Sequence, residues 1–479
     1  MAIYLGVDIG TTSAKCLAVD ENGAVLAQSQ QPYPIMHPAQ GWAEQDPEDY
    51  WRALSATVRG CVSKCKELGR DASEIASIAM STQGDTLIVT DESGKPLTSA
   101  ISWMDTRGEV ECAELLSEAD QSFWYRESGA LLSVIGSVCS IRWLEKNKPD
   151  IISNKPHYCF VPDFLAKRLV GEFVIDISSA SWTPLCSPCS RAWSNAVLEL
   201  LGISRSDVSE TMESGEVIGE IKPDIASELG LASGVKLIAG AFDQAAAAYG
   251  VGASVGGRGV LSCGTAWVLY SVSSMPPFDA SECLSICCHV KPSEWGLVLP
   301  FSGGSTYDWL NRMFTQTNTA PSGSKLPIFI PHLYGGLSPD WRSESRGSLV
   351  GLTMSHTQED IRLALMRGIA CEARRNMEAA ELLCGRVESV RMVGGAGKSD
   401  IWPQMVSNIL NRPVELPDCV ESACYGAAKL AAGEVSSGWS GFDNVRLFSP
   451  VEGNVSDEQQ NYDRYMRFYR TLLWIYASE

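Results

Sequence analysis

The feature that most constrains the fold is a small polar turn between two strand-like segments at the start of the chain. Ile3 to Asp8 is apolar and ends in a carboxylate, and Ala14 to Asp20 is apolar again. Between them lie Gly10, which allows a tight turn, and Thr11 to Ser13, whose amides and hydroxyls can surround an anion. The pattern predicts a strand–turn–strand unit that binds phosphate. An ordinary turn hydrogen-bonded to Asp8 is the alternative.

The second half of the chain repeats this arrangement. Gly259 to Ser262 and Trp267 to Tyr270 are apolar, and Cys263-Gly264-Thr265 lies between them. A cluster of glycines precedes the repeat, and 479 residues are too many for one ordinary hydrophobic core. We therefore expect a duplicated unit, with one domain over residues 1–250 and a second over residues 251–479.

Strand and helix patterns alternate along both halves. Asp46 followed by Pro47 is typical of a helix start, and this helix is expected to run to about Leu68. Ile75 to Met80 and Lys236 to Phe242 have the composition of buried strands. Such alternation predicts a layered α/β fold.

Composition narrows the class of protein. The net charge of −19 and the pI of about 4.8 argue against nucleic acid or an anionic membrane as the main partner. No apolar run reaches the length of a membrane helix, and no signal peptide is recognisable before the first strand. We expect a cytoplasmic protein whose 16 cysteines are mostly free thiols. Cys186 and Cys189 lack the second pair that a zinc site needs.

Two further segments could carry chemistry. Asp243 ends a buried strand, where a carboxylate can act as a general base or simply cap the next helix. The segment from Gly394 to Ser399 follows another strand, but Met392 stands where a Walker A loop needs glycine. Its backbone could approach a flat ligand such as adenosine, or it could be only a tight strand-to-helix turn.

Taken in order, these segments resemble the FGGY family of carbohydrate kinases. The further matches are Gly41-Trp42-Ala43-Glu44-Gln45-Asp46-Pro47, Pro162-Asp163-Phe164-Leu165, Ala239 to Ala245, Arg346 to Thr353, and Gly394-Gly395-Ala396 with Ser399, Trp402 and Gln404. The resemblance covers about residues 3 to 432. It implies two duplicated actin-like ATPase (ribonuclease H-like) domains around a central cleft, and ATP with Mg²⁺ as the cofactors.

The resemblance also assigns roles to individual residues. Asp243 would be the general base that takes a proton from a sugar hydroxyl, and Asp8 would be associated with Mg²⁺. The nucleotide would be bound by Gly10, Thr11, Thr12, Ser13, Lys15, Gly264, Thr265, Gly304, Asp308, Gly394, Gly395, Ala396 and Ser399. The sugar would be bound by Gln83, Gly84, Asp85, Trp103, Asp105, Asp243 and Gln244.

The identity of the sugar is less constrained. Xylulokinases usually carry Gln-Met-His-Gly where this chain has Thr82-Gln83-Gly84-Asp85, and the Gln-Gly-Asp form looks more like polyol and L-xylulose kinase relatives. We favour a ketopentose of the xylulose type, with a polyol or a sugar acid as rivals. A non-catalytic sugar or nucleotide sensor and an actin-like filament or chaperone ATPase are alternatives of another class. The sequence does not determine the oligomeric state, and a homodimer is possible.

Overall fold

The computed structural model describes residues 2–314, 320–323, 325–418, 421–439 and 445–476. The chain divides into two compact units, and each is a composite of separate segments. Unit 1 comprises Met1–Gly252, Ile286–Gly296 and Glu421–Gly441, and unit 2 comprises Ala253–Ser285, Leu297–Val420 and Phe442–Glu479. The chain passes from unit 1 to unit 2 after Gly252 and returns to unit 1 twice.

Unit 1 is built on a six-stranded mixed sheet with the order β13-β14-β5-β1-β2-β3. The strands are β1 (Ile3–Ile9), β2 (Ser13–Asp20), β3 (Val25–Pro32), β5 (Ile75–Thr82), β13 (Val217–Glu220) and β14 (Lys236–Phe242). β1 is antiparallel to β2 and parallel to β5, and β14 is parallel to β5. The predicted strand–turn–strand unit is therefore confirmed as the β1–β2 hairpin.

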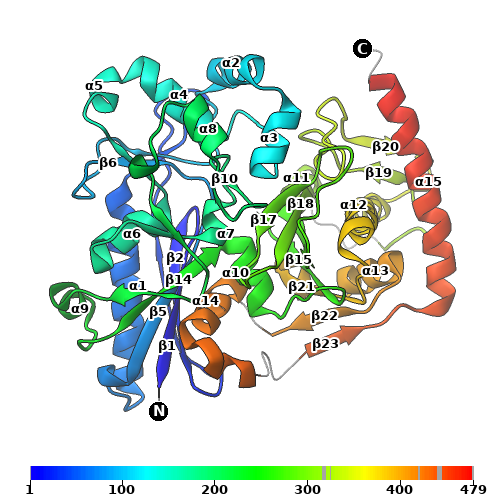
Figure 1. The fold of residues 1–479 in the computed structure, drawn as a ribbon. Helices are drawn as coiled ribbons and strands as arrows, with labels where there is room; N and C mark the ends of the chain where they lie inside the picture. Colours follow the sequence, from blue (N-terminus) through cyan, green and yellow to red (C-terminus); the bar gives the residue numbers. More distant parts are fainter. Residues whose placement is uncertain (1, 315–319, 324, 419–420, 440–444, 477–479) are drawn as a thin grey trace. The chain divides into compact units, whose positions relative to one another are not determined.

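Helices cover both faces of this sheet (Figure 1). On one face α1 (Pro47–Glu67) starts where predicted, because the Asp46 side chain accepts a hydrogen bond from the Glu48 amide. On the other face lie α10 (Asp243–Gly250) and α14 (Ser422–Ala432). Gly6 makes the close packing of α14 possible, since a Cβ there would lie 1.9 Å from the Cys424 carbonyl oxygen.

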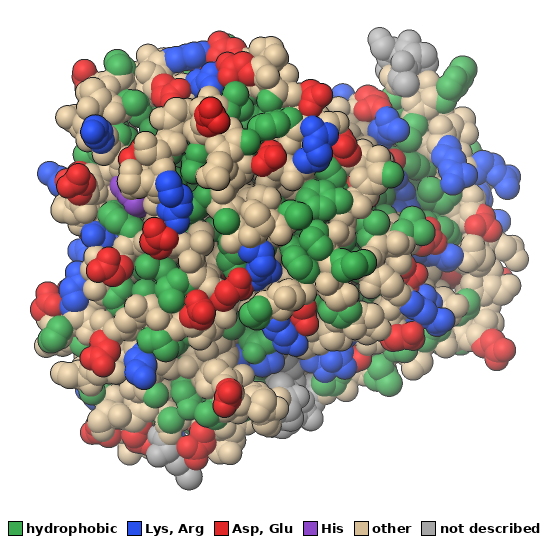
Figure 2. Space-filling model, in the orientation of Figure 1, with side chains coloured by type: hydrophobic (Ala, Val, Ile, Leu, Met, Phe, Trp, Pro, Cys, Tyr) green, Lys and Arg blue, Asp and Glu red, His purple; other side chains and the backbone are tan. Residues whose placement is uncertain are grey.

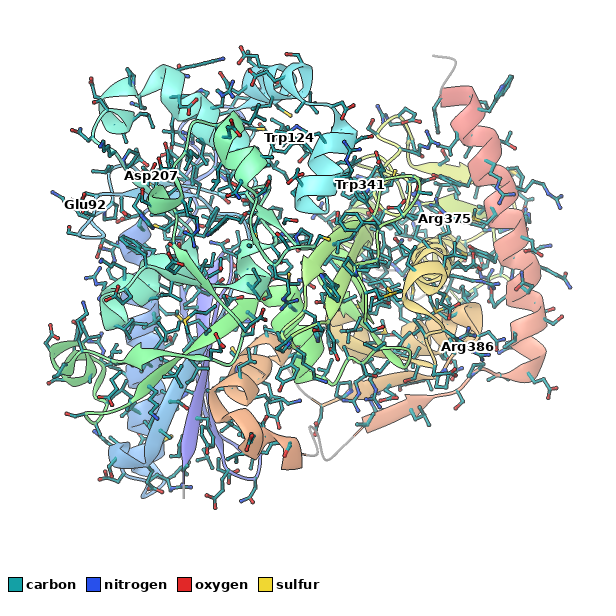
Figure 3. All side chains as sticks on the ribbon, in the orientation of Figure 1. Glu92, Trp124, Asp207, Trp341, Arg375 and Arg386 are labelled. Carbon is teal, nitrogen blue, oxygen red and sulfur yellow. The ribbon has the colours of Figure 1, made fainter. Side chains whose placement is uncertain are left out.

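A second hydrophobic core in unit 1 is formed largely by the segment between residues 87 and 208. It includes α2 (Glu109–Glu118), α3 (Gln121–Ser128), α4 (Ser137–Asn147), β6 (Ile88–Thr90) and β8 (His157–Cys159). Trp124 on α3, labelled in Figure 3, is fully buried in this core. The core fixes the position of α4, whose first residue contacts the candidate site described below.

Unit 2 repeats the connectivity of the unit 1 sheet. From β18 onward its strand order is β18-β16-β15-β21-β22-β23. The strands are β15 (Arg258–Cys263), β16 (Ala266–Ser273), β18 (Trp295–Ser302), β21 (Ser389–Gly394), β22 (Val414–Pro417) and β23 (Val445–Phe448). As in unit 1, the first two strands form an antiparallel hairpin and the three central strands are parallel. The predicted internal duplication is confirmed.

Three helices pack on the unit 2 sheet, and they are α11 (Gly304–Met313), α12 (Gln358–Cys384) and α13 (Ile401–Leu410). The C-terminal helix α15 (Glu452–Tyr476) packs on α12 and α13. Arg375 on α12, labelled in Figure 3, bonds to Glu372 and Asp340, and Tyr465 and Tyr469 of α15 donate to the same two carboxylates. This network holds the C-terminal helix against α12.

The remaining elements are short. They are β4 (Glu44–Gln45), β7 (Ala100–Ile101), α5 (Pro149–Ile152), α6 (Val161–Val170), β9 (Val174–Asp176), α7 (Ile177–Ala180), β10 (Cys186–Ser187), β11 (Ala192–Trp193), α8 (Asn195–Leu200), β12 (Glu210–Met212), α9 (Pro223–Leu229), β17 (Ser285–Cys288), β19 (Ile328–Ile330) and β20 (Ser348–Val350). Acidic and basic side chains are interspersed on the face shown in Figure 2. In the described part of the chain, no helix has the length and apolarity needed to cross a membrane.

Candidate active site

Three parallel strands of unit 1 end side by side. In the ladder, Phe242 of β14 is opposite Thr82 of β5, and Thr82 is opposite Ile9 of β1. The carboxyl ends of parallel strands are where open α/β sheets bind ligands. The residues that follow these ends are Asp243-Gln244, Gln83-Gly84-Asp85 and Gly10-Thr11-Thr12. The structure thus gathers, from three distant parts of the sequence, five of the seven residues that the resemblance assigns to the sugar and three of those that it assigns to the nucleotide.

Asp243 is a carboxylate at the end of β14, and part of it is buried. Its Oδ1 is buried without a hydrogen-bond partner among the described residues, and the amide and side chain of Gln244 lie close enough to the carboxyl group to favour its ionised form. Burial, followed by the negative charge of Asp8, raises the pKa of Asp243 to about 7. The helix α10 begins at Asp243 itself, and its N-cap position is Phe242. The alternative that Asp243 is only a helix cap is therefore wrong, and a carboxyl group that titrates near neutral pH suits a general base.

The loop after β5 presents a second acidic group. Asp85 has a positive φ of 52°, and its Oδ2 accepts a hydrogen bond of 3.1 Å from the amide of Ser137, the first residue of α4. Its Oδ1 is buried and has no partner among the described residues. Burial raises the pKa of Asp85 to about 7, although the side chain and the amide of Ser137 both favour the ionised carboxylate.

Gly84 cannot carry a side chain in this loop. A Cβ at this position would lie 2.1 Å from Cδ1 of Trp182 and 2.8 Å from the Phe242 ring. Trp182 and Phe242 are stacked with ring centroids 4.6 Å apart. Gly84 therefore lets the loop after β5 pack closely on this aromatic pair, which includes the last residue of β14.

Six polar atoms of unit 1 are buried at this edge without a hydrogen-bond partner in the described structure. They are Thr82 Oγ1, Gln83 Oε1, Asp85 Oδ1, Ser137 Oγ, Asp243 Oδ1 and Gln244 Oε1. Buried polar groups in proteins are normally satisfied, so such a group points to an absent polar ligand. Ser137 is distant in sequence from the strand ends, and no motif around it indicates a site. Only its contact with Asp85 identifies it as a site residue. Thr82 is the last residue of β5 and could have been found from its position.

The turn between β1 and β2 has its carbonyl groups tied to the protein interior. The Tyr33 hydroxyl donates to the Gly10 carbonyl, Gln45 Nε2 donates to the Thr11 carbonyl at 2.9 Å, and the Tyr33 amide donates to the Thr12 carbonyl. The amides of Thr11 and Thr12 donate to no acceptor in the described chain. Because the carbonyls point away, these N–H groups are available to an anion, as an anion-binding turn requires.

Other predicted phosphate ligands in unit 1 are partly engaged. The Ser13 hydroxyl accepts a hydrogen bond from Gln30, and Lys15 forms an ion pair of 2.7 Å with Glu421. Lys15 also lies close enough to Asp8 to lower the pKa of that carboxyl. Its positive charge is therefore shared between two carboxylates rather than free for phosphate.

Asp8 lies next to the last residue of β1, close to the phosphate turn. Its Oδ1 accepts a hydrogen bond of 2.9 Å from Ser81, and burial raises its pKa to about 6. The negative charges of Asp8 and Asp243 interact with each other. Mg²⁺ is commonly held by one or two carboxylates, water and substrate phosphates. No set of three or more His, Cys, Asp or Glu residues suited to a metal occurs among the described residues. The donors present thus fit Mg²⁺ that arrives with a nucleotide.

The structure separates the roles of Trp103 and Asp105. The partly exposed Trp103 donates its indole N–H to Thr11 Oγ1 at 3.1 Å, beside the phosphate turn. Asp105 is buried, and both of its carboxylate oxygens are occupied by Arg107 and by the Arg107 and Ala43 amides. The contacts of Asp105 therefore do not support its assignment to the sugar; they make it a support for the Trp103 loop.

Unit 2 has a corresponding turn. Gly264 and Thr265 connect β15 to β16, and their carbonyls accept hydrogen bonds from the Gly304 and Ser305 amides at 3.1 and 2.9 Å. A Cβ at Gly304 would lie 2.4 Å from the Gly264 carbonyl oxygen, so the start of α11 packs closely on the turn. Asp308, one turn further along α11, is exposed. Gly264, Thr265 and Gly304 are thus brought together, and Asp308 lies on the surface of the same helix.

The glycine-rich segment after β21 lies next to this turn. Gly394 has a positive φ of 98°, and a Cβ there would lie 2.7 Å from the Cys263 carbonyl oxygen. A 3₁₀ turn over Gly395–Lys398 and then Ser399 lead to α13. Gly394 and Gly395 are exposed, whereas Ala396 is buried. This open, side-chain-poor backbone is the kind of surface that a flat ring can approach.

An aromatic cluster supports this part of unit 2. The ring centroid of Trp402 lies 4.9 Å from those of Trp267 and Tyr307. Trp402 Nε1 is buried without a partner among the described residues. Cys186 and Cys189, the other pair noted in the sequence, are free thiols, with Cys186 buried and Cys189 exposed.

Comparison with known proteins agrees with this arrangement. Residues 3–250 match the FGGY family of carbohydrate kinases, N-terminal domain, and residues 302–434 match the C-terminal domain of the same family. The chain is 28% identical to a gluconokinase of Bacillus subtilis (99% of this chain, 94% of the relative) and 27% identical to a xylulose kinase of Escherichia coli (90% and 89%). A xylulose kinase structure from Lactobacillus acidophilus superposes with a TM-score of 0.91 over 100% of both chains at 24% identity. The chain belongs to the FGGY family of carbohydrate kinases.

Proposed function

We propose that this enzyme uses ATP to phosphorylate a hydroxyl group of a small uncharged sugar, with a ketopentose such as xylulose as the favoured substrate. The observation that carries the proposal is the set of six buried, unpartnered polar atoms at the strand ends of unit 1. Five of them are hydrogen-bond acceptors or hydroxyls within three residues of a strand end, and a polyhydroxylated ligand would satisfy them.

The charge of the site favours an uncharged substrate. Asp85 and Asp243 are both acidic, and no lysine or arginine in the described structure lowers the pKa of either group. A sugar acid would bring its carboxylate into this environment without a compensating cation, which is costly in a buried site. Ketoses and polyols carry no such charge.

Asp243 is the proposed general base. A carboxyl group with a pKa of about 7 is partly ionised at neutral pH and can accept the proton of the attacking hydroxyl. Gln83, Asp85 and Gln244 would orient the sugar through their unpartnered oxygens. Phosphoryl transfer needs positioning and charge stabilisation more than covalent catalysis by the protein.

The two glycine–threonine turns are the proposed phosphate ligands. In unit 1 the amides of Thr11 and Thr12 are available to a phosphate group. In unit 2 the exposed Gly264–Thr265 turn is available in the same way. Gly394, Gly395 and Ala396, with Ser399, are proposed to line the adenosine. Asp8 would hold Mg²⁺ through water, and the cation would neutralise charge on the transferred phosphate.

A sugar acid is the second candidate, because a gluconokinase is among the relatives at similar identity. A polyol such as erythritol or a pentitol is uncharged and would suit the same acceptors. A non-catalytic sensor would have no need of the unpartnered Asp243.

The deciding experiment measures ADP release with Mg-ATP on a panel containing D-xylulose, L-xylulose, erythritol, xylitol and D-gluconate. Sugar-stimulated turnover on one of the first four and not on gluconate is expected. Turnover confined to gluconate would overturn the proposed substrate class, and equal turnover without any acceptor would indicate a simple ATPase. Asp243→Asn should bind nucleotide and lose nearly all turnover.

A further inference from the structure

The segment from Gly41 to Pro47 was noted in the sequence only because it matches the family. In the structure its most buried polar residue is Gln45, which has no solvent exposure and lies in the short strand β4. The Gln45 side chain makes four hydrogen bonds. Nε2 donates to the carbonyls of Thr11 at 2.9 Å and Pro34 at 3.3 Å, and Oε1 accepts from the Tyr50 hydroxyl at 2.8 Å and from Gln83 Nε2 at 3.3 Å.

These bonds fix which end of Gln83 is left for a ligand. Gln83 Nε2 donates both to Gln45 Oε1 and to the Tyr50 hydroxyl oxygen at 3.2 Å, so both of its N–H groups are used. Its Oε1 is buried and unpartnered in the described structure. Gln83 can therefore only accept a hydrogen bond from a sugar hydroxyl, and Gln45 with Tyr50 imposes that orientation.

The same two residues act on the phosphate turn. Gln45 holds the Thr11 carbonyl toward the interior, which directs the turn's amides the other way. Tyr50 packs edge-on against Tyr33, with ring centroids 5.5 Å apart, and the Tyr33 hydroxyl donates to the Gly10 carbonyl. One buried cluster thus supports the loop after β5 and the turn after β1, which lie on neighbouring strands.

We propose that Gln45 and Tyr50 are positioning residues that couple sugar binding to nucleotide binding. When a sugar hydroxyl donates to Gln83 Oε1, the amide is held more firmly against Gln45, and Gln45 is held against Thr11 in the phosphate turn. Each ligand therefore orders the cluster on which the other depends, so each increases the affinity of the other. The sugar half of this inference rests on the proposed function, whereas the nucleotide half does not.

Two substitutions test the effect on sugar binding and the effect on nucleotide binding separately. Tyr50→Phe keeps the ring and its packing but removes the hydroxyl that Gln83 and Gln45 share. Gln45→Glu keeps the acceptors for Tyr50 and Gln83 but loses the N–H groups that Thr11 and Pro34 accept. Thr57→Val is the matched control, because Thr57 is buried on the same helix as Tyr50 and its hydroxyl bonds only to carbonyls of that helix.

The measurement is the dissociation constant of D-xylulose with and without a saturating non-hydrolysable ATP analogue, and that of the Mg²⁺ complex of the analogue alone. Tyr50→Phe should weaken sugar binding about tenfold, which corresponds to about 1.4 kcal/mol, and should lower the coupling factor toward one. Gln45→Glu should weaken binding of the analogue by a similar factor, and Thr57→Val should change neither constant more than about twofold.

The outcomes separate the two proposals. If the wild-type enzyme binds no sugar of the panel, the proposed function fails, and the affinity of Gln45→Glu for the analogue still decides the nucleotide arm. If sugar binds but both variants keep wild-type constants and coupling, the positioning role is refuted. It is also refuted if all three variants weaken binding equally, since that would indicate only a general loss of packing. Thermal unfolding of each variant shows whether it is folded.

Discussion

Replacing Asp243 with asparagine should abolish turnover and at the same time make the protein more stable. Asn is nearly isosteric with Asp but carries no charge, so it removes the cost of burying an ionised carboxylate. The pKa of Asp243 is raised from an ordinary value of 3.8 to about 7, mainly by burial. The folded protein therefore holds this proton more tightly than the unfolded chain does, and wild-type stability falls as the pH rises from about 4 to about 7.

The size of the effect follows from the shift. One pKa unit corresponds to 1.36 kcal/mol, so a shift of about three units destabilises the ionised wild-type protein by at most about 4 kcal/mol above pH 7. At pH 5 Asp243 is protonated in the folded protein and mostly ionised in the unfolded chain. At this pH the wild type is therefore about 1.5 kcal/mol less stable than it is when Asp243 is protonated in both states. The variant lacks this dependence. Its advantage in stability should therefore grow by about 2.5 kcal/mol between pH 5 and pH 8.

The assay is thermal or urea unfolding of both proteins at pH 5, 6, 7 and 8, with EDTA and without nucleotide, because a bound cation would offset the charge. Asp150→Asn, a substitution of an exposed aspartate, is the control and should change stability little at any of these pH values. A variant that is less stable than the wild type at pH 8, or whose difference from the wild type is the same at all four values, would refute the account of Asp243 as a buried, unpaired carboxylate.

Three further outcomes follow from individual contacts. The kcat/KM of the wild type should fall about tenfold per pH unit below pH 7 as Asp243 is protonated, and a rate that is flat from pH 8 to pH 5.5 would exclude this base. Gly84→Ala should lose sugar binding, because its Cβ would lie 2.1 Å from Trp182; a steady-state KM within threefold of wild type would contradict the close packing. Asp105→Asn leaves Arg107 without a full partner and should lower the unfolding free energy by about 3 kcal/mol, with unchanged nucleotide affinity as evidence that it is structural.

The parts of the fold that could be predicted are those that depend on the pattern of residues close together in the sequence. The β1–β2 hairpin, the start of α1 at Asp46 and the long helix α12 each depend on residues that are neighbours in sequence. The duplication could be predicted because the same glycine–threonine turn opens both halves, and the two sheets share one strand order and direction. The return of α14 to unit 1 could not, since its small residues become meaningful only beside Gly6 and Gly250.

The residues of the candidate site also divide into those that could be predicted from the sequence and those that could not. Asp243 and the Gly10 turn could be proposed because each follows a recognisable strand, and strand ends are where such sheets bind ligands. Gln83 could be proposed from the resemblance to the family. Ser137 and Tyr50 could not, because each lies on a helix and reaches the loop after β5 only through contacts made by the fold. Asp105 shows the converse: the carboxylate lies in a segment matched to the sugar site, and its partners Arg107 and Ala43 use all of its oxygens.

The acidic character of the site bears on the acceptor as well as on the base. Asp85 and Asp243 both titrate near neutral pH, so at least one of them is protonated in much of the population and can donate as well as accept. A polyhydroxylated neutral molecule has donors and acceptors that match both groups. The anionic carboxylate of a sugar acid would raise the pKa of either group further, which is the reason we propose a neutral substrate.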